Sequence, residues 1–256
     1  MKNDISAILK ELCPPIVLDR LKRFKIKLQA HFSHQISNLI IGDPKGQDLD
    51  IYWNKDMAQV LETWGEGNVW NEIQFLMVNC QGKVLDIACG TGKTIELCSQ
   101  FPDIDMYGCD ISDFLIQKAY ERGIPSERLS ICDATKTDYG NNFFDYAYSI
   151  GSLEHFTEEG ILNSISECYR IVRKNSFIMV PVSKRSKDEG WIKPAQSYFN
   201  NSVEWWMDKF KTKYNNVTVL NSSWHDDISV GKWFVCTKCE NRENPARTIR
   251  KLKGST

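Results

Sequence analysis

From residue 83 onward, short apolar runs alternate with segments whose apolar residues recur at helical spacing. The runs predict strands at 83–88, 105–110, 129–132, 143–149, 176–182, 216–223 and 231–238. The periodic segments predict helices at 91–101, 113–122, 158–173 and 202–213. Such alternation is typical of a parallel sheet covered by helices. Because only Trp224 to Val230 separate the last two strands, no crossover helix fits there, and we expect an antiparallel hairpin at the sheet edge.

The first 80 residues do not follow this alternation. Near-helical spacing of apolar residues over 1–35, interrupted by two prolines, predicts a helical arm. After a polar loop, an aromatic-rich stretch over 57–77 is expected to cap the active edge of the core. The pattern therefore predicts an arm and substrate-site cap over 1–80, a core over 81–240 and a loose polar tail over 241–256.

Composition describes an ordinary globular chain. Of its 256 residues, 42% are hydrophobic and 25% are charged, and the net charge is −1. Because basic residues are not in excess for binding a phosphate backbone, we expect no nucleic-acid partner. No apolar run is long enough to span a bilayer and no signal-peptide pattern is present, so we expect a cytoplasmic protein. The nine cysteines, an odd number, predict reduced thiols.

The most informative local pattern is an apolar strand that enters a glycine turn and then a helix, over 84–94. Gly90 and Gly92 allow a ligand to approach the backbone, and the helix N-terminus offers free N–H groups. A P-loop would need its first glycine where Ile87 stands, and a nicotinamide-binding turn would need its third glycine where Ile95 stands. Both nucleotide motifs are therefore incomplete, and a tight turn can also need glycine for steric reasons alone.

The same segment resembles motif I of the Rossmann-like methyltransferases, an acidic residue at a strand end followed by small residues and Gly-x-Gly. Asp86, Ala88, Gly90 and Gly92 fit this pattern, with Ala88 where the family often has glycine. The resemblance implies a three-layer α/β fold with a seven-stranded, mostly parallel sheet and an antiparallel last strand. It also implies S-adenosylmethionine as the cofactor, bound by these residues and Cys89.

Two further family positions follow the next two predicted strands, and the resemblance extends over 82–239. Asp110, followed by Ile111, stands where the family has an acidic residue that accepts hydrogen bonds from the ribose hydroxyls. Asp133 and Ala134 stand where the family's aspartate bonds the adenine amino group and its apolar neighbour packs on the ring. Taken singly, either aspartate could be only a strand-end or capping residue.

The segment after the fourth predicted strand resembles the family's Leu-Glu-His segment at the mouth of the site. It begins with Ile150 and Gly151, which the resemblance assigns to cofactor binding. His155 in the same segment is a candidate general base because an imidazole can take a proton at neutral pH. Alternatively it only shapes the loop, since methyl transfer to a good nucleophile needs mainly alignment.

Two other groups of residues are candidates for catalysis or metal binding. His225, with the aspartates that follow it, could act as a second base, although a solvated hairpin is the simpler interpretation. Cys236 and Cys239 form one pair only, whereas structural zinc needs four ligands. We therefore expect no metal.

Aromatic residues before the core and after the fifth predicted strand favour a small or medium-sized acceptor. Tyr52, Trp53 and Tyr198, together with Glu154, are candidate substrate-binding residues, with ordinary packing as the alternative for the aromatic rings.

The stretch Glu11–Leu18 is similar to the N-terminal Leu-x-Pro-Pro stretch of methyltransferases found with bacterial surface-polysaccharide genes. That resemblance implies O-methylation of a sugar, or of a substituent destined for a capsule or lipopolysaccharide. Basic and apolar residues over 20–28 could contact a membrane surface, with a solvated helix face as the alternative. A methyltransferase for another small molecule or lipid, a P-loop-type nucleotide enzyme and an inactive cofactor-binding partner subunit remain alternative functions.

Overall fold

The structure, a computed structural model, describes residues 47–193 and 196–238. The predicted arm over 1–35, with its possible membrane-contact segment 20–28, and the predicted tail over 241–256 lie outside the described residues. Within the described ranges, none of the helices combines the length and the apolar character needed to cross a bilayer.

Seven strands form one sheet in the order β3-β2-β1-β4-β5-β9-β8. Their bounds are β1 (Gly82–Ile87), β2 (Ile104–Asp110), β3 (Leu129–Ile131), β4 (Phe144–Ile150), β5 (Val172–Ser183), β8 (Asn216–His225) and β9 (Ser229–Thr237). The pairs β1–β2, β1–β4, β2–β3 and β4–β5 are parallel, whereas β9 runs antiparallel to β5 and β8. The predicted mostly parallel sheet with an antiparallel last strand is confirmed, and the final hairpin places β8 at the edge.

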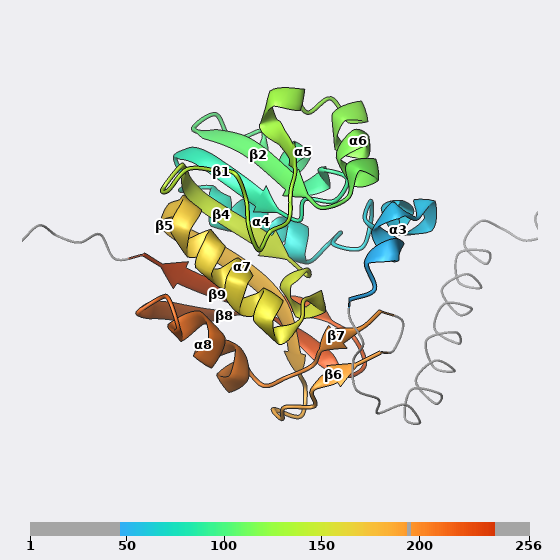
Figure 1. The fold of residues 1–256 in the computed structure, drawn as a ribbon, viewed down its shortest axis with the longest axis vertical. Helices are drawn as coiled ribbons and strands as arrows, with labels where there is room; N and C mark the ends of the chain where they lie inside the picture. The colour runs from blue at the N-terminus through green and yellow to red at the C-terminus, as the bar shows by residue number, and fades with distance from the viewer. Residues whose placement is uncertain (1–46, 194–195, 239–256) are drawn as a thin grey trace, which may run out of the picture.

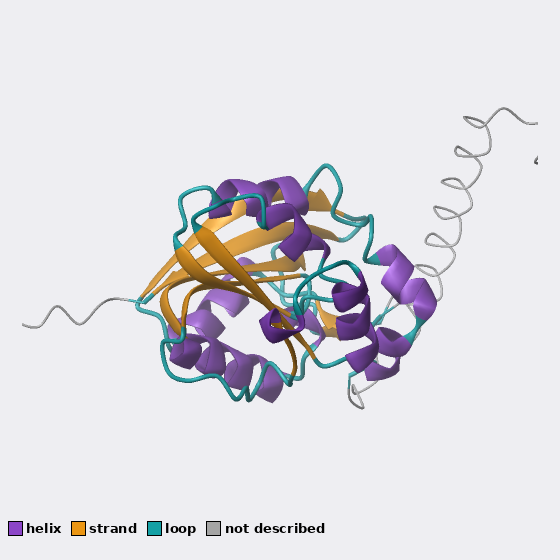
Figure 2. Ribbon diagram, turned by 90° about the horizontal axis from the view of Figure 1, so that it is seen from above, coloured by secondary structure: helices purple, strands orange, loops and turns teal. Residues whose placement is uncertain are grey.

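Helices cover both faces of this sheet, so the fold has three layers (Figure 1, Figure 2). One face carries α4 (Val69–Met77), α5 (Lys93–Cys98) and α6 (Asp113–Glu121), and the other carries α7 (Glu158–Ile171) and α8 (Val203–Lys211). The alternation of side chains along β5 shows why two cores form. Phe177 and Met179 pack into the first core, whereas Ile178 and Val180 pack into the second.

Hydroxyl side chains fix the start of three helices close to the predicted positions. Ser112, Thr157 and Ser202 each accept a hydrogen bond from the backbone N–H three residues further on. The boundary between α7 and β5 differs from the prediction, because Val172 of the predicted helix 158–173 is already extended and pairs with Phe144 of β4.

The structure also contains short elements that the sequence pattern did not predict. They are η1 (Leu49–Trp53), α3 (Lys55–Val60), η2 (Ser126–Arg128), η3 (Leu153–His155), β6 (Trp191–Ile192) and β7 (Tyr198–Phe199). Two contacts attach η1 to the start of α6. Ser112 Oγ donates to the carbonyl oxygen of Tyr52 at 2.7 Å, and Trp53 Nε1 donates to Asp113 Oδ1 at 2.7 Å. These bonds hold the segment before the core beside the carboxyl end of β2.

The partly buried carboxylate of Glu72 joins α4 to the last two strands. Glu72 accepts hydrogen bonds from the hydroxyl of Ser222, from the backbone N–H and hydroxyl of Ser223, and from the indole N–H of Trp233. Burial would raise the pKa of Glu72, but the hydrogen bonds from Ser223, Trp233 and Ser222 outweigh it and lower the pKa. We call this arrangement the Glu72 clamp.

We expect Glu72→Gln to lower the free energy of unfolding by about 1–2 kcal/mol at pH 7, because charge-assisted hydrogen bonds are lost. The folded-state pKa of Glu72 lies below its ordinary value of 4.5, so its contribution is complete above that value and disappears as the pH falls through the folded-state pKa. Urea unfolding at pH 7 and pH 3 measures both effects. The exposed Glu66→Gln is the control, and a difference that grows on acidification would contradict the argument.

Candidate active site

The turn after β1 uses left-handed backbone at three positions. Ala88, Gly90 and Gly92 have φ values of 59°, 54° and 73°. An L side chain is strained in this region, which explains why the resembling family often has glycine at the position of Ala88. An ideal Cβ on Gly90 would lie 3.0 Å from Leu61 Cδ1, so glycine keeps the space above the turn open.

Asp110 connects this turn to the start of α6. Its Oδ2 accepts a hydrogen bond from the backbone N–H of Gly90 at 2.9 Å, and its Oδ1 accepts one from the N–H of Ser112 at 2.9 Å. Burial raises the pKa of Asp110, and the backbone N–H groups offset part of that rise. The carboxylate therefore fixes the glycine turn and presents its remaining lone pairs to the cavity.

Asp86 lies beneath the turn at the end of β1. Thr94 and Tyr148 both donate hydroxyl hydrogen bonds to its Oδ2, the latter at 3.0 Å. Burial raises the pKa of Asp86 to about 7. Asp86 thus ties β1 to β4 and α5 from inside the fold.

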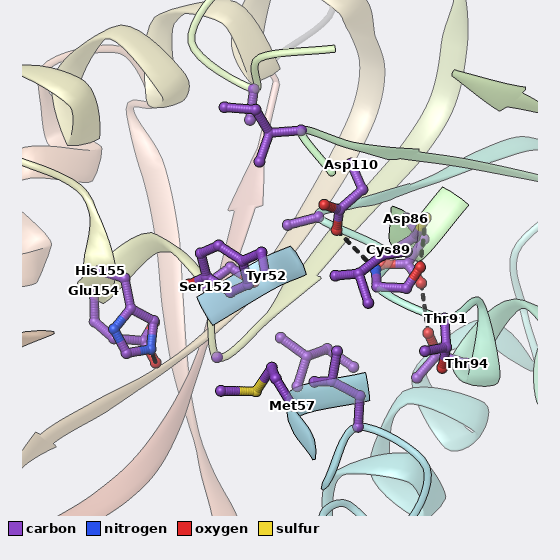
Figure 3. Close-up of a pocket in the computed structure, with 18 of the residues that line it drawn as sticks. Tyr52, Met57, Asp86, Cys89, Thr91, Thr94, Asp110, Ser152, Glu154 and His155 are labelled. Atoms are coloured by element: carbon purple, nitrogen blue, oxygen red, sulfur yellow. Dashed lines mark hydrogen bonds and ion pairs between the residues drawn. The ribbon is translucent and has the colours of Figure 1, made fainter. Parts of the chain in front are cut away.

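A cavity of about 500 Å³ opens above the carboxyl ends of the strands. The residues predicted for the cofactor that line it are Asp86, Ala88, Cys89, Gly90, Asp110, Ile111, Asp133, Ala134, Ile150 and Gly151. Tyr52, Glu154 and His155 also lie in its wall. In the close-up of Figure 3, the glycine turn and Asp110 lie on one side, and Glu154 and His155 lie together on the other.

Four predicted residues lie outside the cavity wall. Gly92 faces Ala119 and Ile124, so it serves the packing of the turn. Trp53 is 43% exposed and bonds to Asp113 of α6. Their predicted contact with ligand has no support in this geometry.

The other two candidates outside the cavity wall are Tyr198 and His225. Tyr198 is buried, and its hydroxyl lies 3.2 Å from Ser229 Oγ. His225 is exposed on the final hairpin, where its Nδ1 lies 3.2 Å from the carbonyl oxygen of Ser223. The hairpin carries His225 away from the cavity, so of the two histidines that the structure describes, His155 is the one that lines it. Over 47–193 and 196–238, no three histidine, cysteine, aspartate or glutamate side chains are grouped to hold a metal.

Several lining residues were not predicted, among them Gln47, Met57, Leu61, Gln196 and Trp224. Gln47 Nε2 donates to the carbonyl oxygen of His155 at 3.1 Å, and Gln196 Nε2 donates to the Tyr52 hydroxyl at 2.7 Å. No sequence signal marks these glutamines, because their contacts join segments more than 100 residues apart.

The cavity suits a cationic ligand. Four carboxyl groups lie in its wall, those of Asp86, Asp110, Asp133 and Glu154. Among the described residues of the wall, Lys93 is the only lysine or arginine, and it pairs with Glu96 at 2.8 Å. The sulfonium of S-adenosylmethionine is positively charged, and its ribose offers hydroxyl donors to Asp110. Volume, charge and the open glycine turn therefore fit this cofactor.

Comparisons with known proteins agree with that fit. A family model described as a methyltransferase domain matches residues 84–175. A tRNA (carboxymethyluridine(34)-5-O)-methyltransferase of Arabidopsis thaliana is 29% identical over 161 residues, covering 60% of this chain and 37% of that protein. The ubiquinone/menaquinone biosynthesis C-methyltransferase UbiE of Burkholderia mallei is 26% identical over 179 residues, covering 66% of this chain and 72% of that protein. The chain thus spans well under half the length of the Arabidopsis relative.

Solved structures show the same fold. A chain in the complex between the Haloferax volcanii Trm112 methyltransferase activator and a methyltransferase superimposes with a TM-score of 0.60 at 12% identity, covering 77% of this chain and 100% of that chain. Haemonchus contortus phosphoethanolamine N-methyltransferase 2, solved with S-adenosyl-L-methionine, has a TM-score of 0.60 at 15% identity, covering 78% of this chain and 61% of that chain. Residues 84–175 therefore match a methyltransferase domain, and the chain has the fold of these solved methyltransferases.

Proposed function

We propose that this chain transfers the methyl group of S-adenosylmethionine to a hydroxyl oxygen of a small or medium-sized acceptor. The favoured acceptor is a sugar, or a substituent of a bacterial capsule or lipopolysaccharide. The single observation that carries the proposal is the acidic cavity, which joins the cofactor turn to a second polar end at Glu154 and His155. The stretch at 11–18 supports the polysaccharide class.

The cofactor supplies an activated methyl group when it is bound. Asp110 would hold the ribose hydroxyls, and Asp133 with Ala134 would hold the adenine, at the carboxyl ends of β2 and β3. Trp64, Trp70 and Trp224 line the same cavity and would exclude water around the reacting atoms. Alignment of the acceptor oxygen with the methyl group is then the main contribution of the protein.

The segments preceding the core contribute to this cavity. Tyr52 of η1, Met57 of α3 and Trp70 of α4 all line it. We assign them to a substrate-site cap, within an arm and cap over 1–80 that precedes a catalytic core over 81–240.

Ligand-dependent thermal stability tests the cofactor assignment. At a concentration about a hundredfold above Kd, S-adenosylmethionine or S-adenosylhomocysteine should stabilise the fold by about 2.7 kcal/mol, which raises Tm by roughly 5–10 °C. ATP with magnesium and NAD, measured in parallel, should leave Tm unchanged because both nucleotide motifs are incomplete. Stabilisation by ATP with magnesium alone would favour the P-loop alternative instead.

A tRNA substrate is the second candidate, because the Arabidopsis relative is named a tRNA methyltransferase. The net charge of −1 disfavours it, since basic residues are not in excess for binding a phosphate backbone. Transfer of a labelled methyl group to total tRNA and to a panel of sugars and nucleotide-activated sugars separates the two candidates. Methylated tRNA with unmodified sugars would overturn the saccharide proposal. Tight cofactor binding without turnover on any acceptor would indicate the inactive partner subunit.

A further inference from the structure

Glu154 lines the cavity and has one buried carboxyl oxygen without a hydrogen-bond donor. Its side chain is 5% exposed, and its Oε2 accepts no hydrogen bond from any residue that the structure describes. A buried carboxyl oxygen without a hydrogen-bond donor is costly, so natural proteins rarely keep one without a purpose. A ligand that donates a hydrogen bond would satisfy it.

His155 adds a second acceptor beside it. Its Nδ1 lies 2.8 Å from the carbonyl oxygen of Ser197, and because a carbonyl can only accept, Nδ1 must carry the hydrogen. Burial lowers the pKa of His155 to about 4, so the ring is neutral and Nε2 has a free lone pair. This Nε2 lies 3.8 Å from Glu154 Oε1, too far for a direct hydrogen bond.

We propose that Glu154 takes the proton of the attacking acceptor hydroxyl, while His155 Nε2 accepts a hydrogen bond from a neighbouring hydroxyl of the same acceptor. This inference rests on the proposed function and narrows it. The acceptor presents two adjacent hydroxyls, as on a sugar ring, to two hydrogen-bond acceptors 3.8 Å apart. Above pH 8, where Glu154 is ionised, a carboxylate or phosphate group would face only lone pairs here and is excluded from this end of the cavity.

The chemical step balances in atoms and charge. The hydroxyl oxygen forms a bond to the methyl carbon while the bond from sulfur to that carbon breaks, and its electron pair remains on sulfur. The hydroxyl proton passes to the Glu154 carboxylate. One carboxylate and one sulfonium are thereby converted to a neutral carboxyl group and a neutral thioether.

Because the carboxylate must be ionised, we expect kcat to rise with pH. Burial raises the pKa of Glu154 to about 8, which places the inflection there. The groups around it titrate elsewhere. The pKa of the adjacent His155 is about 4, and burial raises the pKa values of Tyr52 and Tyr198 above their ordinary range. Asp48, which acts on His155 and Tyr52, has a pKa of about 2. Asp86, with a pKa of about 7, lies beneath the glycine turn, and Glu154→Gln separates the two because only Glu154 is lost.

The deciding experiment uses the full chain with ¹⁵N-labelled histidine, saturated with S-adenosylhomocysteine, at about pH 9, where Glu154 is ionised. The chain has four histidines, so His155→Gln assigns the resonance of interest. Glycerol, methyl glucoside and sodium acetate are titrated in parallel against the wild type, Glu154→Gln and the control Glu121→Gln, whose side chain is exposed on α6.

We expect Nε2 of His155 to be unprotonated. Its ¹⁵N resonance should shift when glycerol or methyl glucoside is added to the wild type or to Glu121→Gln, and should not shift when acetate is added. In Glu154→Gln the new amide can donate to Nε2, so the response should fall at least tenfold. A protonated Nε2, no response to either hydroxyl probe, or an equal response to acetate would overturn the proposal. Failure to bind S-adenosylhomocysteine would instead point to failure of the proposed function.

Kinetics on an acceptor found in the sugar panel add a second readout. Glu154→Gln should lower kcat about a hundredfold with little change in KM, and the inflection near pH 8 should disappear, because a general base is lost while the site keeps its shape. A purely structural role would change stability and KM without removing the inflection.

Discussion

Asp110→Asn should weaken the binding of S-adenosylhomocysteine about a thousandfold, or about 4 kcal/mol. Each carboxylate oxygen accepts a backbone N–H, from Gly90 or Ser112, and each such charged hydrogen bond contributes roughly 1.5–3 kcal/mol. An asparagine offers only one acceptor, so its amide group would face a backbone N–H donor and displace either the glycine turn or the start of α6. Isothermal titration calorimetry measures the loss.

Asp103→Asn is the matched control, because Asp103 is exposed just before the same strand, β2. It should bind as tightly as the wild type. If Asp110→Asn binds within threefold of the wild type, Asp110 does not organise the cofactor site.

Gly92→Ala should lower the free energy of unfolding by about 2–5 kcal/mol. The backbone there has a φ of 73°, where an L side chain costs roughly 1–2 kcal/mol. The new Cβ would also lie 2.4 Å from Ile124 Cδ1 and 3.0 Å from Ala119 Cβ, and overpacking of this kind costs roughly 1–3 kcal/mol more. Equilibrium unfolding in urea measures the sum.

The chain offers a control that separates strain from overpacking. Gly67 has a φ of 75°, and an added Cβ there meets nothing within 4 Å, so Gly67→Ala carries only the strain. Ile124→Val removes the atom that Gly92→Ala would strike, so the double variant should recover part of the loss. If Gly67→Ala and Gly92→Ala lose the same free energy of unfolding, and the double variant recovers none of it, packing of the turn is unimportant.

The long strands and helices were predictable because the apolar patterns that define them lie within single stretches of sequence. Strands buried on both faces are continuous apolar runs, so β1, β4 and β5 stood out in the sequence. Apolar residues at helical spacing placed the starts of α6, α7 and α8 within one residue of where the structure has them. The hairpin of β6 (Trp191–Ile192) and β7 (Tyr198–Phe199) was not predicted, because two residues are too few to show a period.

Site residues were predictable only where a sequence motif or their place at the end of a predicted strand marked them. The glycine turn and Asp110 belong to consecutive strand ends, so their meeting followed from a parallel sheet. Gln47 and Gln196 reach the cavity through contacts between distant segments, which no local pattern encodes. The same limit applies to His225, whose solvent-facing position depends on the geometry of the final hairpin.

The Glu72 clamp also sets an order of events during synthesis. Three of its four hydrogen bonds come from Ser222 and Ser223 of β8, and the fourth comes from Trp233 of β9, which inserts between β5 and β8. Until β9 has left the ribosome, β8 cannot join the sheet and the Glu72 clamp cannot form. The hydrogen bonds of Glu72, which lies two residues from Trp70 in the cavity wall, therefore form only after β8 and β9 have emerged, so the cofactor can act as a late stabiliser of the newly made protein.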